Sequence, residues 1–362
     1  MLQFIKIEKA SDYMILRIPQ YCEKFRCIAD KCRDSCCIGW EIDIDEKTAS
    51  FYDSVGGDFG KRLRSNITTG ETRCFRLDSS ERCPFLNEHN LCDIYINLGE
   101  ENLCQICTDH PRYYEWFDGV KEGGVGLCCE AAAVLILSEE FSLVEKEIPT
   151  ESADEYDKEF YSCLYSARES IISHLMNKDY PLSQALCDIL LYAEALQYNV
   201  DNGDLAKMNI THTGKSLSYD IKAILSFLQT LEIMDETWMP YVKTLSESYD
   251  RIAPEMKNFR MQNPEVSKYL RNIAVYFVWR YFMKGVFDGE FVSRIKLMTV
   301  SCFVLEYLFC YEWVCDGSAG LEAYAEAARR YSKEIEYCEE NLNTLYDAFY
   351  ELEIFGTQNV TE

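Results

Sequence analysis

The chain has 362 residues, of which 36 are basic and 61 acidic, so its formal net charge is −25. Apolar residues make up 48% of it, enough to bury a core, and the length suits one or two globular domains. So acidic a chain is excluded as a general nucleic-acid binder, because its charge repels phosphates. Its unusual feature is a total of 18 cysteines, twelve of them within the first 130 residues.

The cysteines are expected to be reduced, because the sequence predicts a cytoplasmic protein. Residues 1–9 contain neither the apolar segment nor the cleavage site of a secretory leader. The longest apolar run, residues 297–315, is interrupted by Glu306 and Glu312, so we expect a buried helix and no transmembrane segment. In a reducing compartment, clustered cysteines are metal ligands or redox groups rather than disulfides.

Composition divides the chain near residue 140. Residues 1–130 hold most of the cysteines and 10 of the 17 glycines, and their apolar stretches are short. Farther along, apolar residues recur at helical spacing. We therefore predict a mainly α protein, in which a loop-rich, cysteine-rich metal-binding region of residues 1–140 packs on an all-helical domain of residues 141–362.

Several helices can be placed within this second region. A capping box that begins at Ser152 predicts one helix start, and Pro181 predicts another, with that helix ending before Asn202. A third helix is expected after Pro264, continuing through Tyr281. The last helix is predicted from a stripe of apolar residues that alternate at spacings of three and four. Its members are Ile335, Cys338, Leu342, Leu345, Phe349 and Leu352.

Most cysteines of the first region lie in close groups. The groups are Cys27-x4-Cys32-x3-Cys36-Cys37, Cys83-Pro84, Cys92, Cys104-x2-Cys107 and Cys128-Cys129. Thiolates prefer zinc, copper(I) or iron–sulfur clusters, and spacings of two to four residues let one loop wrap one metal centre. The six cysteines of the second region show no ligand spacing and are interpreted as core residues.

The cysteine count favours an iron–sulfur cluster over zinc. Only Cys104 and Cys107 form the CxxC pair typical of zinc ribbons, and the four histidines of the chain form no catalytic zinc motif. A cluster needs several thiolates and tolerates irregular spacing. Zinc stays open as the alternative metal. The adjacent Cys36 and Cys37 side chains should point apart, which suggests a site with several irons or one unused thiol.

These motifs resemble the flagellin lysine-N-methylase family, within a wider group named for a zinc- or iron-chelating CxxCxxCC cysteine cluster. The resemblance covers residues 25–135. It departs at Cys104, His110 and Cys129, where the family has serine, tyrosine and proline. Residue by residue, it implies metal-ligand status for Cys27, Cys32, Cys36, Cys37, Cys83, Cys92, Cys107 and Cys128.

The resemblance implies transfer of a methyl group from S-adenosyl-L-methionine to lysines of flagellin, by an enzyme that carries a 4Fe-4S iron–sulfur cluster. Two alternatives stay open: an iron–sulfur or zinc-binding redox or interaction protein, and an iron-dependent enzyme that modifies another peptide. The sequence places neither the S-adenosylmethionine site nor a catalytic base. Asp109, Tyr113 and Glu130 lie near the cysteines and could accept a proton. Residues 123–126, the one glycine-rich stretch, are predicted to form a flexible turn rather than a cofactor loop.

Overall fold

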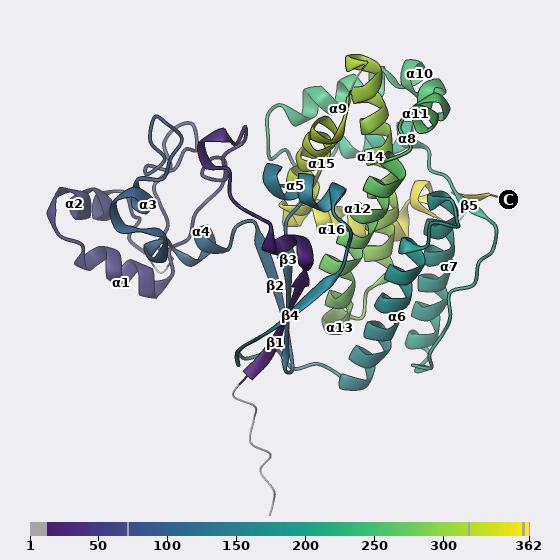
Figure 1. Ribbon diagram of the computed structural model, residues 1–362, viewed down its shortest axis with the longest axis horizontal. Coiled ribbons are helices and arrows are strands. Elements are labelled where there is room, and N and C mark those ends of the chain that lie inside the picture. The colour runs from purple at the N-terminus through teal and green to yellow at the C-terminus, as the bar shows by residue number, and fades with distance from the viewer. Residues whose placement is uncertain (1–12, 71, 318, 357–358, 362) are drawn as a thin grey trace, which may run out of the picture.

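A helical body and a smaller lobe beside it make up the structure (Figure 1). The computed structural model describes residues 13–70, 72–317, 319–356 and 359–361. Residues 1–9, for which no leader was predicted, lie outside this part of the chain. Within it helices predominate over strands, so the predicted mainly α class is confirmed.

A four-stranded sheet, which the sequence did not predict, lies where the lobe meets the body. Its strands are β1 (Tyr13–Pro19), β2 (Arg112–Phe117), β3 (Val120–Val125) and β4 (Leu143–Pro149), in the order β2-β3-β1-β4. β1 pairs in parallel with β3 and antiparallel with β4. The boundary predicted at 140/141 falls just before β4, so both predicted regions contribute strands to one sheet.

The smaller lobe is formed by the long connection between β1 and β2. We call residues 37–109 the cysteine lobe. It contains α1 (Glu46–Ser54), α2 (Gly57–Ser65), α3 (Asp93–Leu98) and α4 (Gln105–Asp109), which lie together on one side of the molecule (Figure 1). Asp45 caps α1 by accepting a hydrogen bond from the Thr48 amide at 2.9 Å. The rest of the lobe is irregular, as the glycine content predicted.

The helical body contains the remaining helices and one short pair of strands. Its helices are α5 (Glu130–Ser138), α6 (Lys158–Met176), α7 (Leu182–Asp201), α8 (Ile221–Leu228), α9 (Trp238–Glu247), α10 (Tyr249–Ile252), α11 (Met256–Gln262), α12 (Val266–Tyr281), α13 (Gly285–Asp288), α14 (Val292–Asp316), α15 (Leu321–Glu336) and α16 (Glu339–Glu351). The strands are β5 (Ser216–Leu217) and β6 (Val360–Thr361). Together these elements enclose one large apolar core.

α14 is the central helix of the body. It packs against α7, α12, α15 and α16. In the described part of the chain it is the one helix long and apolar enough to cross a membrane, but 67% of its most apolar stretch is buried inside the protein. Such burial is typical of a core helix, as predicted for residues 297–315.

Some of the other helices predicted from the sequence agree with the structure and some do not. The helices expected at Pro181 and after Pro264 are confirmed as α7 and α12. The predicted start at Ser152 is wrong, because α6 begins at Lys158, where the Asp157 carboxylate accepts from two backbone amides. The apolar stripe predicted as one helix is divided between α15 and α16 by a break at Tyr337.

Candidate functional site

The structure divides the clustered cysteines into two groups. The first, which we call the junction thiols, lies between the cysteine lobe and the helical body. The second, the lobe thiols, lies within the cysteine lobe. The junction thiols are Cys27, Cys32, Cys36 and Cys129, whose charges act on one another. The lobe thiols are Cys37, Cys83, Cys92, Cys104 and Cys107.

The junction thiols come from one loop and from the start of α5. Cys129 is the N-cap of α5. A helix N-terminus carries a partial positive charge, which stabilises anionic groups such as thiolates or an iron–sulfur cluster. Burial raises the pKa of the Cys129 thiol to about 11. Cys27 and Cys36 are exposed, so this group is open to solutes.

Ion pairs attach the cysteine loop to the body. Asp34 accepts hydrogen bonds from Arg329 at 2.6 Å and from Lys333 at 2.8 Å, both on α15. Arg33 bonds to the carboxylate of Glu130 on α5, through its backbone amide at 2.9 Å and its guanidinium at 3.0 Å. These pairs position Cys32 and Cys36 beside Cys129.

The lobe thiols are more deeply buried. Cys104 and Cys107 lie on the first turn of α4 with their sulfurs 3.3 Å apart, within hydrogen-bonding distance. The Cys83 amide donates to the Cys37 carbonyl at 2.9 Å, which brings two loops together. Burial raises the pKa of Cys83 to about 12. A hydrogen bond from the Cys36 thiol lowers the pKa of Cys37 to about 7.

Among the described residues, no three Cys, His, Asp or Glu side chains form a coordination shell as they stand. The donor chemistry of both groups nevertheless suits metals that prefer thiolates, because each supplies at least four sulfurs from neighbouring loops. The four junction thiols equal the ligand number of a 4Fe-4S cluster. They include Cys129, which lay outside the set implied by the resemblance.

Cys128 lies apart from both groups and faces a cluster of tyrosines instead. Its thiol is hydrogen-bonded to Tyr337, and burial raises its pKa to about 12. The tyrosines surround the guanidinium of Arg280, with ring centres 4.7 to 5.9 Å from it. They are Tyr113, Tyr276, Tyr281 and Tyr337.

A buried carboxylate completes this tyrosine cluster. Glu336 Oε2 accepts from Tyr276 at 2.8 Å and Tyr281 at 2.9 Å, and lies 3.2 Å from Arg280. Its Oε1, like the hydroxyl of Tyr113, has no hydrogen-bond partner among the described residues. Unpartnered buried oxygens are costly, so the cluster has spare capacity to bind a polar group.

Half-exposed rings connect the tyrosine cluster to the cysteine lobe. The His110 ring lies 5.3 Å from Trp40 and 6.1 Å from Tyr337. Burial and the nearby charge of Arg280 lower the pKa of His110 to about 4, so its imidazole is neutral at pH 7. It can therefore accept a hydrogen bond at its unprotonated ring nitrogen.

The predicted proton acceptors have other contacts. Glu130 is paired with Arg33, and Asp109 accepts from the side-chain Nε2 of Gln105 at 2.8 Å. Tyr113 does belong to the tyrosine cluster. The sequence missed Arg280 and Glu336, because they lie more than 140 residues from the clustered cysteines of residues 27–129 and show no motif.

The glycine-rich stretch is not a flexible turn. Gly123 and Gly124 lie in β3, where the rings of Tyr114 and Tyr113 occupy the space that a Cβ atom would need. The correction has a simple cause: strand glycines often permit close packing by aromatic neighbours, and sequence alone does not reveal those neighbours.

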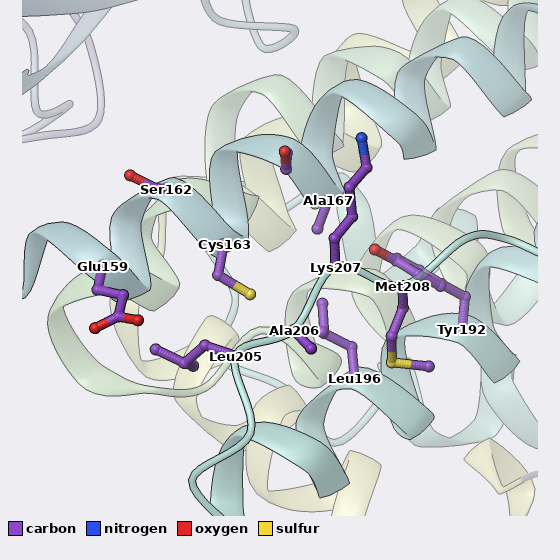
Figure 2. A pocket seen from close by; sticks show the side chains of 11 residues that line it. Glu159, Ser162, Cys163, Ala167, Tyr192, Leu196, Leu205, Ala206, Lys207 and Met208 are labelled. Atoms are coloured by element: carbon purple, nitrogen blue, oxygen red, sulfur yellow. The ribbon is translucent and has the colours of Figure 1, made fainter.

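Two cavities of the body lie away from the junction thiols and the lobe thiols. One of about 230 Å³ lies between α6, α7 and the loop at residues 205–208; its labelled side chains include Cys163, Tyr192 and Lys207 (Figure 2). The other, of about 460 Å³, lies at the start of α7 and α12, with Arg260 and Glu306 among its lining residues. No residue of the cysteine lobe lines either cavity.

Comparisons with known proteins point to one family. The family model described as the FliB lysine N-methylase C-terminal domain matches residues 168–361. Proteins named Lysine-N-methylase from Salmonella typhimurium (strain LT2) and Salmonella choleraesuis are each 25% identical over 277 residues, which cover 71% of this chain and 61% of theirs. The flagellar biosynthetic protein FliU of Salmonella muenchen is 28% identical over 131 residues, or 33% of this chain and 76% of its own. No solved structure matches. The chain thus spans less than two thirds of the lysine-N-methylase relatives.

Proposed function

This chain belongs to the FliB lysine N-methylase family, and we propose that it methylates the ε-amino groups of lysines on flagellin. The match of residues 168–361 to that family carries the proposal. The relatives named Lysine-N-methylase and the flagellar relative support it. The cysteine pattern adds support from residues 25–135, which lie outside the matched helical domain.

The cofactors we propose are S-adenosylmethionine and a 4Fe-4S cluster. The cluster would be held by the junction thiols Cys27, Cys32, Cys36 and Cys129, whose number suits it and two of which, Cys27 and Cys36, are exposed. S-adenosylmethionine supplies the methyl group, carried on a sulfonium. Cationic groups are stabilised by aromatic faces, and the rings of Trp40, His110 and Tyr337 provide such faces beside the junction thiols.

The residues of the junction suit a lysine substrate. An ammonium must lose a proton before its nitrogen can accept a methyl group. We propose that the lysine loses that proton to solvent before its amine enters the junction. The neutral imidazole of His110 would then orient the amine by accepting a hydrogen bond from it, and the tyrosine cluster behind His110 excludes water. The net charge of −25 would attract a lysine-bearing surface.

The test is methylation by the anaerobically purified protein. Incubated with S-adenosylmethionine, a low-potential reductant and flagellin of the same organism, it should methylate flagellin lysines, as peptide mass spectrometry would show. Cys36→Ser should abolish activity. The matched control Cys315→Ser, at an exposed cysteine of the body, should retain it. His110→Ala should lower kcat and leave the iron content unchanged.

Two outcomes would contradict the proposal. Protein that binds S-adenosylmethionine and leaves flagellin unmodified would indicate another peptide substrate. Protein that does not bind S-adenosylmethionine would indicate the redox or interaction protein that the sequence left open.

A further inference from the structure

The cysteine lobe and the helical body share no apolar core. Every buried residue of the small core lies within residues 37–109, and every buried residue of the large core lies outside them. The half-buried apolar side chains that pack against each core follow the same division. Two units in one chain are expected to move relative to each other unless a large apolar interface joins them.

Polar contacts between the two units are confined to the chain that connects them. In the part of the chain that the structure describes, the lobe makes its hydrogen bonds internally or with residues 35–36 and 110–112. Its ion pairs, such as that of Arg62 with Asp93, are internal. The lobe therefore stands beside the body on two short connections, residues 34–36 and residues 110–111 (Figure 1).

Both connections are anchored to the body. Asp34, in the first connection, is paired with Arg329 of α15 at 2.6 Å. In the second connection, the Pro111 carbonyl accepts a hydrogen bond from the Gly126 amide at 2.8 Å. The freedom to turn therefore lies between these anchors and the lobe, because a hinge needs only a few loop residues that absorb the change in backbone angles.

A stack of aromatic rings closes the lobe on the body. The ring of Trp40, in the lobe, lies 5.3 Å from the ring of His110, which in turn lies 6.1 Å from that of Tyr337. Trp40 Nε1 donates to the Cys36 carbonyl at 2.5 Å, which holds the indole beside the junction thiols. Such an aromatic pair contributes about as much as one hydrogen bond, so thermal motion can break and re-form it.

We propose that the cysteine lobe is a lid on the junction. It turns about its two connections, and the stacking of Trp40 on His110 holds it closed. Opening uncovers His110 and Tyr337, and closing returns the indole to them. The motion itself does not require methyl transfer. Its role rests on the proposed function, under which opening admits a lysine on the surface of a folded protein and closing excludes water from it.

Pulsed electron paramagnetic resonance on the full chain tests the proposal. Nitroxide labels are attached through a keto amino acid, which leaves the cysteines untouched, in place of the exposed Asp58 of the lobe and Tyr198 of the body. The unaltered protein should give a closed distance and a longer, open one. Trp40→Ala should raise the ratio of open to closed protein by about two- to tenfold, which is the contribution of one aromatic pair. His110→Leu removes the other ring and should shift the ratio in the same direction.

The matched control is the same substitution at another half-buried tryptophan. Trp116, in β2, has its ring contact with Tyr114 of the same strand, so Trp116→Ala should leave the ratio unchanged. Labels in place of Tyr198 and Ile233, both exposed on the body, should give one narrow distance in every variant.

The unaltered protein alone can overturn the proposal, so the test does not depend on whether a variant folds. One lobe-to-body distance as narrow as the distance within the body would show that the lobe is fixed. Equal shifts from Trp116→Ala and Trp40→Ala would show that the ring contact with His110 is not what holds the lobe. The measurement contains neither S-adenosylmethionine nor flagellin. A lobe that moves in protein without methylating activity would therefore reject only the proposed function.

Discussion

The cysteine lobe and the helical body reach an ordered state by different means. The body encloses one continuous apolar core, built from helices that run up to 25 residues. The lobe has twelve buried core residues and long irregular loops, which are bridged by arginines. The side chain of Arg82, for example, donates to the Asn87 carbonyl at 2.6 Å and to Asn90 at 2.8 Å. We infer that hydrophobic packing stabilises the body, whereas the lobe depends on what its thiols bind.

The largest expected effect of one substitution lies in the body. Glu122 is 4% exposed and accepts from the fully buried Arg168 at 2.5 and 2.7 Å. Glu122→Gln leaves the Arg168 charge buried without a counter-ion, so we expect the free energy of unfolding to fall by about 3–5 kcal/mol. Urea denaturation followed by circular dichroism would measure it.

The control for this change is an exposed carboxylate. Glu145 pairs with Arg17, which also contacts Glu122, but its side chain is 54% exposed. Glu145→Gln should cost less than about 1 kcal/mol. Equal losses from the two substitutions would show that the buried pair does not contribute as described.

The body should also become less stable as pH rises. Burial raises the pKa of Glu334 to about 7. The folded state therefore holds this proton up to higher pH than the unfolded chain does. Protonated Glu334 makes its full contribution to the free energy of unfolding below about pH 4.5. This contribution, about 2–3 kcal/mol, is lost as the pH rises through 7.

Glu334→Gln mimics the protonated acid and tests this pH dependence. Its urea midpoint should equal that of the unaltered protein at pH 5 and exceed it at pH 8. A variant that is less stable at both values would contradict the assigned direction of the pKa shift.

A smaller effect is expected where the two regions meet. Asp34→Asn removes a charge that faces Arg329 and Lys333, but its carboxylate is 24% exposed, so we expect a loss of about 1 kcal/mol or less. Hydrogen exchange of residues 28–37 should accelerate while the helices stay protected. Asp58→Asn, at a side chain that is 97% exposed, is the control and should change neither region.

The sequence predicted what depends on local pattern. The positions of α7 and α12 followed from proline and apolar spacing, and the burial of α14 from its composition. The sheet was missed because β1 pairs with strands more than 100 residues away in the chain. The break at Tyr337 shows no glycine or proline; its side chain contacts Arg280, which is a tertiary interaction.

The cysteine site was predicted only in part, because some of its features depend on local spacing and others on long-range contacts. Spacing identified the loop with Cys27, Cys32 and Cys36, but the division into two groups depends on how loops fold over one another. Cys128 and Cys129 are adjacent, and only the start of α5 determines which of them faces the junction. No sequence pattern linked either to Arg280.

Hydrogen exchange with and without metal tests the contrast between lobe and body most directly. Anaerobically purified protein would be compared with protein from which zinc and iron have been removed by chelation, using mass spectrometry to resolve segments. We expect residues 37–109 to lose most of their protection and residues 158–355 to keep theirs, because the cysteines implied as metal ligands lie outside residues 158–355 and metal bound to them would stabilise the lobe. Unchanged protection of residues 37–109 after complete metal removal would contradict the account.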